Sequence, residues 1–285
     1  MGTFLKDFKN LVKLRLTFLV VFSASISFLI ASESQESINW YNWLILIIGG
    51  FLVTSAANGF NEIIEKDLDK LMKRTMDRPL PSGRMTNGQA LVLSLIMGIF
   101  GTYLLGSLNP ATGYLSVFSI LFYAFIYTPL KQKSPIAVLV GAIPGALPPL
   151  IGYVAAHGQI DKIALVLFAI QFVWQFPHFW AIAWVLDDDY KKAGFRLLPT
   201  TKRDKTSAII TWLSTLILIP VSLLPTYYGF GGYVIGGVSL IMGLIFSYQA
   251  LTLVRKLDVK SAQSLMYGSF IYLPVVQLVL LFNLK

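Results

Sequence analysis

Long apolar stretches follow one another along almost the whole chain, separated by short polar ones. Nine stretches approach or exceed the roughly 20 residues that a helix needs to cross the hydrocarbon core of a bilayer. They do not alternate apolar and polar residues as the strands of a membrane barrel do, so we predict helices. The predicted spans are 15–32, 40–60, 89–107, 111–128, 135–156, 161–186, 206–225, 230–253 and 265–284.

The composition agrees with this pattern. Hydrophobic residues make up 55% of the 285 residues and charged residues only 13%, whereas a soluble protein carries about 25% charged residues. Cysteine is absent, which excludes disulfides, thiolate metal sites and cysteine nucleophiles. We therefore expect an all-α integral membrane protein whose residues 1–285 form a single membrane-embedded domain.

Basic residues mark one side of the predicted bundle. Of the 23 lysines and arginines, 21 lie in the N-terminal segment or after even-numbered spans, and only Lys162 and Lys285 lie on the other side. The positive-inside rule makes the basic side cytoplasmic, with the N-terminus inside and the C-terminus outside. Because topology accounts for the net charge of +9, we expect no nucleic-acid partner.

Two long charged segments, about 58–88 and 187–205, are the predicted active-site loops. Amide and carboxylate side chains of the first fall within about 100° of arc on one helical face. These residues are Asn58, Asn61, Glu62, Glu65 and Asp69. Carboxylates one turn apart can hold Mg²⁺, which bridges to substrate phosphates. Arg74 and Arg78 offer planar forks for phosphate oxygens, so the pattern predicts a diphosphate site that opens into apolar helices.

The same residues have a simpler interpretation, in which they form a solvated helix face with ion pairs such as Glu62–Lys66. The second charged segment favours the functional interpretation. Its Arg196-Leu-Leu-Pro-Thr-Thr-Lys202 matches Arg78-Pro-Leu-Pro-Ser-Gly-Arg84, and each copy follows an acidic cluster. This match indicates an internal duplication with a site between two halves, which is a common membrane architecture.

The span 161–186 contains the run Trp174-Gln-Phe-Pro-His-Phe-Trp180, which includes one of only two histidines. An ionisable residue inside a span is a functional hypothesis by default. The alternative is a neutral His178 that is hydrogen-bonded to a carbonyl freed by Pro177. Near the predicted cytoplasmic end, the rings of Trp174 and Tyr127 could stabilise an allylic cation by about 0.5–2 kcal/mol each.

These residues together resemble a known family. The run Asn61-Glu-Ile-Ile-Glu65-x-x-x-Asp69 resembles the signature of the UbiA-type intramembrane prenyltransferase superfamily. Further stretches resemble the branch of that superfamily that farnesylates haem. They are Met72-x-Arg-Thr-x-x-Arg-Pro-Leu80, Tyr127-Thr-Pro-Leu-Lys-Gln-Lys-Ser134 with the Gly141–Gly152 run, and Trp174–Trp180 continuing to Asp188–Gly194 and Leu198-Pro199.

Where this chain departs from the superfamily also carries information. Quinone-type relatives usually carry a second D-x-x-x-D, and the segment after the sixth span lacks it, which favours the haem branch. Glu62 stands where Asn or Asp is common, and Phe195-Arg196 replaces a more usual Ile-Pro. Neither departure removes a group that the diphosphate site needs, although Glu62 would alter the charge around a metal.

The resemblance implies a fold and a reaction. The fold is a UbiA-like bundle, and the reaction joins farnesyl diphosphate to a vinyl group of haem B with addition of water. The products are haem O and diphosphate, for haem-copper oxidase biogenesis. Mg²⁺ is the implied cofactor, whereas haem B is a substrate. The resemblance also implies a multi-pass protein of the bacterial inner membrane, whose partners are the lipid bilayer and haem A synthase or oxidase assembly factors.

Residue roles follow from the same resemblance. Asn61, Glu65 and Asp69 would hold the metal. Arg74 and Arg78, with Lys131 or Lys133, would neutralise the departing diphosphate, and His178 would contact haem at the iron or at a propionate. The other expected substrate-binding residues are Asn58, Tyr127, Trp174, Asp189 and Arg196.

Two other functions fit parts of the pattern. A related prenyltransferase acting on a quinone precursor or a chlorophyll intermediate would share the first carboxylate face, but the span 161–186 argues against it. A secondary transporter would also be a kinked bundle. Transporters place their ionisable residues near the bilayer midplane, whereas the acidic and basic residues here crowd the predicted cytoplasmic end.

Overall fold

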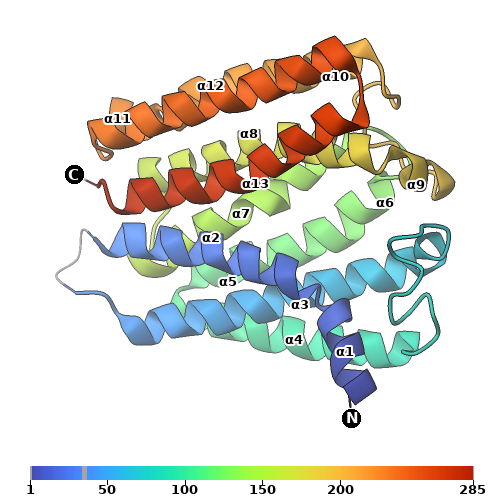
Figure 1. The fold of residues 1–285 in the computed structure, drawn as a ribbon. Helices are drawn as coiled ribbons and strands as arrows, with labels where there is room; N and C mark the ends of the chain where they lie inside the picture. The colour runs from blue at the N-terminus through green and yellow to red at the C-terminus, as the bar shows by residue number, and fades with distance from the viewer. Residues whose placement is uncertain (1, 34–36, 285) are drawn as a thin grey trace.

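The computed structural model describes residues 2–33 and 37–284 and forms a bundle of helices (Figure 1). Nine helices of this described part are long and apolar enough to cross a membrane, which confirms the predicted spans. Their bounds are α2 Leu14–Ser32, α3 Trp40–Asp69, α4 Asn87–Leu108, α5 with its extension Pro110–Leu130, α7 Ala137–His157, α8 Lys162–Val185, α10 with α11 Lys205–Tyr227, α12 Tyr233–Lys256 and α13 Val259–Leu281.

Two shorter helices lie at one end of the bundle. Helix α1 (Gly2–Leu11) runs across the bundle at the end where the long loops lie, and α9 (Asp187–Lys192) caps α8 at the same end (Figure 1). The second span extends beyond the predicted 40–60, because α3 continues without a break to Asp69. The predicted carboxylate face therefore belongs to the spanning helix itself and not to a separate loop.

The spanning helices close into a ring. Helix α3 packs along α4, α10 along α12, and α13 contacts both α8 and α2, which closes the ring. Helix α7 is the most enclosed span and packs along α2. A Cβ atom at Gly152 would overlap the carbonyl of Ala24, so only glycine allows this approach. Small residues at close helix contacts are typical of membrane interfaces.

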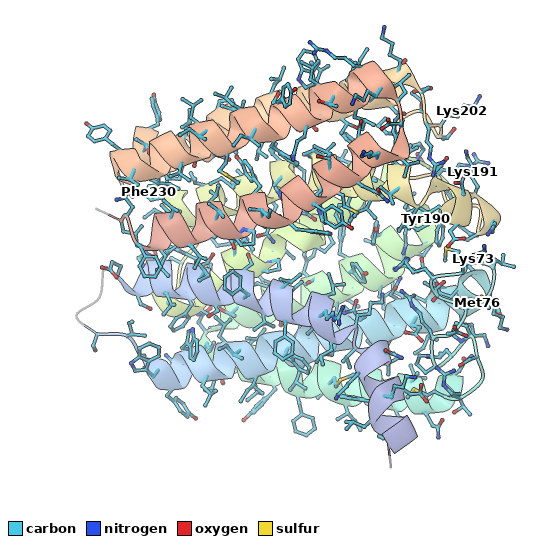
Figure 2. All side chains as sticks on the ribbon, viewed as in Figure 1. Lys73, Met76, Tyr190, Lys191, Lys202 and Phe230 are labelled. Carbon is cyan, nitrogen blue, oxygen red and sulfur yellow. The ribbon has the colours of Figure 1, made fainter. Side chains whose placement is uncertain are left out.

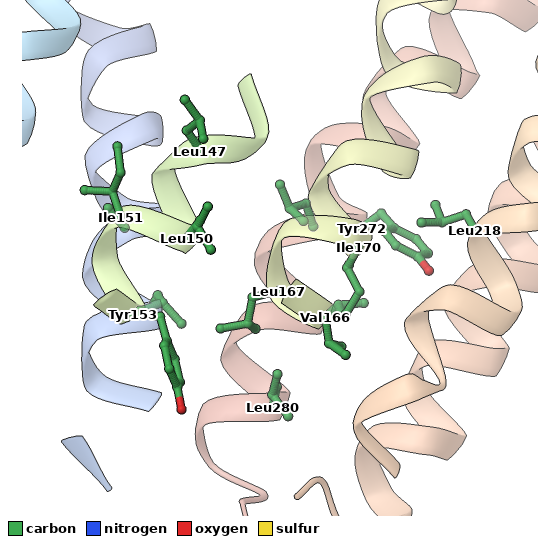
Figure 3. Packing of buried hydrophobic residues seen from close by; sticks show 14 of the residues in the cluster. Leu147, Leu150, Ile151, Tyr153, Val166, Leu167, Ile170, Leu218, Tyr272 and Leu280 are labelled. Atoms are coloured by element: carbon green, nitrogen blue, oxygen red, sulfur yellow. The ribbon is translucent and has the colours of Figure 1, made fainter. Parts of the chain in front are cut away.

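Apolar side chains fill the space between these helices. Figure 3 shows Leu150 on the side of α7 toward Leu167 of α8, and Ile170 of α8 near Tyr272 of α13, all of them buried. Lipid tails are as apolar as these side chains, so the bundle is held by close packing and hydrogen bonds rather than by expulsion of water.

Polar side chains satisfy the backbone where prolines interrupt α7. Pro149 has no N–H, so the carbonyl of Gly145 lacks its usual helical partner. Gln171 of α8 supplies the missing donor, with its Nε2 at 2.7 Å from Gly145 O. Its Oε1 accepts from Ser23 at 2.7 Å and from Gln277 at 3.2 Å. The prolines are thus tolerated because neighbouring helices replace the lost hydrogen bond.

The long charged segments all lie at one end of the bundle. Figure 2 shows Lys73, Met76, Tyr190 and Lys191 at this end, whereas Phe230 lies at the opposite end. This arrangement follows because successive spans run in opposite directions, so the connections after even-numbered spans lie at the same end. That this end faces the cytoplasm stays a prediction from the positive-inside rule.

Candidate active site

A cavity of about 240 Å³ lies at the charged end of the bundle. The five residues predicted as catalytic all line it, together with two of the predicted substrate-binding residues. The polar and aromatic lining residues are Lys13, Asn61, Glu65, Asp69, Arg74, Arg78, Tyr123, Tyr127, Lys131 and Tyr190. Apolar side chains, among them Leu16, Val138 and Ile182, line the rest of the cavity. The cavity is therefore charged on one part of its wall and apolar on the other.

Helix α3 contributes the acidic wall. Asn61, Glu65 and Asp69 recur at intervals of four residues, so they project in one direction, and each is at most 4% exposed. The amide of Asn61 donates to Glu65 Oε2 at 2.9 Å and to the Thr128 hydroxyl at 3.0 Å. Asp67 lies outside this face and is exposed, as its phase on the helix predicts.

Each carboxylate of this wall faces a basic side chain from another segment. Arg78 donates to Asp69 Oδ2 at 2.7 Å, and Lys131 Nζ lies 2.5 Å from Glu65 Oε1. Within the described chain, no three Asp, Glu or His side chains converge as a metal site. The carboxylate and amide oxygens that line the cavity instead belong to Glu65, Asp69 and Asn61.

Glu62 lies on the same helix and is fully buried, but it does not line the cavity. Its Oε1 accepts from the backbone N–H of Leu80 at 3.4 Å, so it contacts the loop that carries Arg78. The unusual Glu at this position therefore orders the loop, and its longer side chain reaches a backbone that is 18 residues away.

A π-helical segment, Phe122–Tyr127, forms the facing wall. Pro129 cannot donate to a carbonyl one helical turn before it, and the Thr128 N–H bonds to Tyr123 O, five residues earlier. The wider turn places Tyr123 and Tyr127 along the cavity with ring centroids 5.3 Å apart. Lys131 Nζ lies 5.0 Å from the Tyr127 ring centroid. Such π-helical turns are frequent at functional sites.

Lys13 is a lining residue that the sequence patterns do not predict. It lies between α1 and α2 with a left-handed backbone (φ 48°), and its Nζ donates to Asn61 Oδ1 at 2.7 Å. Burial, together with the charges of Arg78 and Lys131, lowers the pKa of Lys13 to about 7. Nothing local in the sequence distinguishes Lys13 from the other N-terminal basic residues, because its partner is 48 residues away.

The second charged segment packs against the first at the rim of the cavity. The Asp189 carboxylate accepts from Lys192 at 3.1 Å and from the backbone N–H groups of Lys73 and Arg74, and these hydrogen bonds lower its pKa. Burial raises the pKa of the Tyr190 hydroxyl, which lies beside the Arg74 guanidinium. Asp189 thus joins the two predicted active-site loops without lining the cavity.

The remaining predicted substrate-binding residues lie outside the cavity lining. Asn58 donates to Val12 O and Thr17 Oγ1, both at 3.2 Å, and so connects α3 to the start of α2. Lys133 and Arg196 are exposed at the bundle end, although the Arg196 backbone N–H donates to Lys131 O at 2.9 Å.

Trp174 and His178 form a separate cluster with α13. The Trp174 indole donates to Ser269 O at 3.0 Å, and His178 Nδ1 lies 2.8 Å from Ser269 Oγ. The two rings stack with centroids 4.4 Å apart. Phe179, the next residue of α8, lines the cavity, so the cluster adjoins the cavity through one side chain.

The fold and the cavity together define a class of protein. An intramembrane bundle with acidic and basic side chains above an apolar wall is suited to a ligand with an anionic head and a hydrocarbon tail. The UbiA prenyltransferase family model matches residues 20–273, and the chain belongs to this family. It is therefore a membrane-embedded transferase of prenyl groups.

Individual relatives refine this class. A protein of Cytophaga hutchinsonii named protoheme IX farnesyltransferase is 48% identical over 271 residues, which cover 94% of each chain. A solved structure of a digeranylgeranylglyceryl phosphate synthase shares the fold with a TM-score of 0.81 and 21% identity, covering 98% of each chain. A UbiA homologue from Archaeoglobus fulgidus bound to GPP and Mg²⁺ matches with a TM-score of 0.68 and 12% identity, covering 96% of this chain and 99% of that one.

Proposed function

We propose that this protein transfers the farnesyl group of farnesyl diphosphate to a vinyl group of haem B, with addition of water, to give haem O and diphosphate. The name of the Cytophaga relative supports the acceptor and the donor. The observation that carries the proposal is the cavity, in which four basic side chains face two carboxylates above an apolar wall.

The basic side chains are suited to the diphosphate. Arg74 and Arg78 of the first charged segment and Lys131, which follows the π-helical segment, converge on one cavity, and Lys13, when it is protonated, adds a fourth charge. In the absence of substrate, Arg78 and Lys131 neutralise Asp69 and Glu65. We expect them to turn toward the phosphate oxygens when the donor binds, where they stabilise the charge that develops as the C1–O bond breaks.

The oxygen donors of α3 fit a magnesium ion. Glu65 Oε1 is buried and is paired with Lys131 Nζ, which can leave it for the diphosphate, and Asn61 and Asp69 lie on the same face. Carboxylate and amide oxygens with substrate phosphates are the ligands that Mg²⁺ prefers. When bound, Mg²⁺ would neutralise part of the diphosphate charge, and Asn61, Glu65 and Asp69 would hold it. The Archaeoglobus homologue of the same fold binds Mg²⁺ with GPP.

The apolar wall and the tyrosines are suited to the isoprenoid. Leu16, Val138 and Ile182 would contact its chain, and the rings of Tyr123 and Tyr127 would face the allylic carbon. A tyrosine ring stabilises a nearby cation by about 0.5–2 kcal/mol. The vinyl carbon of haem bonds to C1 of the farnesyl group. Water then adds to the carbon next to the porphyrin ring and loses a proton.

The proposal includes a location. The basic end, which carries the cavity, faces the cytoplasm of a bacterium, and the nine spans lie in its inner membrane. The distribution of lysine and arginine supports this orientation. Farnesyl diphosphate, whose head is soluble and anionic, would then reach the cavity from the cytoplasm.

The reaction can be tested directly. The purified protein in lipid nanodiscs is incubated with haem B, farnesyl diphosphate and Mg²⁺, and the extracted porphyrins are analysed by mass spectrometry. We expect a product heavier by one farnesyl group plus water, and its loss when Mg²⁺ is removed with a chelator. Unmodified haem, with transfer to a quinone precursor in its place, would contradict the acceptor but keep the diphosphate site.

A further inference from the structure

The cluster of Trp174, His178 and Ser269 is a polar site inside the membrane-spanning part of the bundle. The His178 ring is partly exposed and is stacked on Trp174, with an angle of 18° between the ring planes. Trp174 also donates to the carbonyl of Ser269, so α8 and α13 are connected at this point by two side chains. Among the described residues, none forms a hydrogen bond with His178 Nε2.

The Ser269 hydroxyl determines which His178 nitrogen carries the proton. Ser269 Oγ lies 2.6 Å from the carbonyl oxygen of Met266. Two oxygens at this distance repel each other unless a hydrogen lies between them, and a hydroxyl has only one hydrogen. The hydroxyl therefore donates to Met266 and can only accept from His178. It follows that Nδ1 carries a hydrogen, and that Nε2 of the neutral ring carries a lone pair.

We infer that Ser269 is a positioning residue that sets the tautomer of His178, and that His178 Nε2 binds the iron of the haem substrate. The inference rests on the proposed function. A lone pair at Nε2 can bind a metal ion, but it cannot donate a hydrogen bond to a propionate carboxylate. The geometry thus favours the iron over a propionate. Histidines that bind metals almost always donate their other ring N–H to an oxygen, as Nδ1 does here.

The surroundings of His178 are suited to a flat apolar ligand. Phe179 and Phe270 meet the His178 ring at centroid distances of 5.3 and 5.4 Å, and Phe270 is 45% exposed on the outside of the bundle. Phe179 also lines the diphosphate cavity. A porphyrin whose iron binds at His178 Nε2 would enter from the lipid beside Phe270 and extend past Phe179 toward the farnesyl donor.

A comparison of two porphyrins tests whether His178 binds the iron or a propionate. Haem B and iron-free protoporphyrin IX carry the same propionates, and their binding to the full chain in nanodiscs is measured by fluorescence quenching and absorption. We expect Ser269→Ala to weaken haem B binding about tenfold or more and to leave protoporphyrin IX binding unchanged. The iron–histidine band of ferrous haem in resonance Raman spectra should shift in Ser269→Ala and vanish in His178→Ala. Added imidazole should restore the band.

Control variants separate this role from a structural one. Ser239→Ala removes a buried hydroxyl on α12 that has no hydrogen-bond partner among the described residues, and it should change neither porphyrin affinity nor the band. Ser269→Thr keeps the hydroxyl and should keep the wild-type band. If Ser269→Ala does not fold, the His178→Ala comparison of the two porphyrins decides the question.

Specific outcomes would overturn the inference. An equal loss of affinity for haem B and protoporphyrin IX in either variant would place the contact away from the iron. An unchanged band in Ser269→Ala would show that the hydroxyl does not set the ligand. Turnover of the wild-type chain is measured separately. If the wild-type chain farnesylates haem but shows no iron–histidine band, only this inference is contradicted. If the band is present but haem is not farnesylated, only the proposed function is contradicted.

Discussion

At the scale of single residues, the cavity is a set of buried charges that are paired with one another. Asp69 with Arg78 and Glu65 with Lys131 are ion pairs whose acidic members are almost fully buried. Removing one partner of such a pair leaves an uncompensated charge, which is costly. We expect both members of each pair to exchange their partners for a metal and a diphosphate when the donor binds.

Asp69→Asn is the sharpest test of the acidic wall. The amide has nearly the same shape but no charge, so we expect turnover to fall by about 100-fold or more while the helical circular dichroism spectrum is unchanged. Asp67→Asn makes the same change two residues earlier at an exposed position and should keep full activity. Near-wild-type turnover of Asp69→Asn would rule out its role at the metal.

Lys13→Met tests the residue that the sequence patterns do not predict. Loss of one charge that faces the diphosphate should raise the KM for farnesyl diphosphate about tenfold, which is the worth of one hydrogen bond to a charged group. Steady-state kinetics at saturating haem measure this shift. Lys9→Met removes a charge from the exposed side of α1 and is the matched control; equal KM values for both variants would contradict the prediction.

At the scale of elements, two irregular helices shape the site. The π-helical segment brings Tyr123, Tyr127 and Lys131 to the cavity, and α7 remains continuous although it contains three prolines. In both places the backbone loses regular hydrogen bonds. In α7, Gln171 binds the freed carbonyl of Gly145. Beside the π-helical segment, Asn61 of α3 donates to the Thr128 hydroxyl. An irregular backbone inside a membrane is tolerated only where the protein itself satisfies it.

Gln171→Leu tests this account of α7. The substitution leaves the Gly145 carbonyl without a partner in a place that water does not reach, so we expect the free energy of unfolding to fall by about 1–3 kcal/mol. Thermal unfolding in detergent, monitored by circular dichroism, measures the change. Gln263→Leu, at an exposed position of α13, should cost little, and an equal loss in both variants would refute the specific role of Gln171.

At the scale of the whole molecule, every long charged segment gathers at one end of the bundle (Figure 2). The cavity therefore opens between two loops that are far apart in the sequence, at the side where the basic residues lie. Asp189 joins these loops through the backbone of Lys73 and Arg74. The side of the membrane from which a substrate reaches the cavity therefore depends on the orientation of the bundle.

The orientation can be measured because the chain has no cysteine. We expect Met76→Cys, at the charged end, to react with a membrane-impermeant maleimide only after the cells are permeabilised. Tyr227→Cys, exposed at the opposite end, should react in intact cells. The reverse pattern of labelling would mean that the cavity faces the outside.

The sequence by itself determined the nine spans, the end at which the charges gather, and the acidic face of α3. Hydrophobic length, the distribution of lysine and arginine, and a four-residue spacing are local or additive properties, so one chain is enough to predict them. The resemblance to the family rests on short motifs of the same kind, and the matches to known proteins confirm it.

Only the tertiary structure decided which charges meet. The pairing of Lys131 with Glu65, the contact of Lys13 with Asn61 and the bond of Ser269 to His178 join residues that are 48 to 91 positions apart. It also showed that Asn58 and Asp189, which we expected to contact substrate, lie outside the cavity lining and connect neighbouring segments. Partners of this kind depend on how the helices pack, because no local spacing relates residues on different helices.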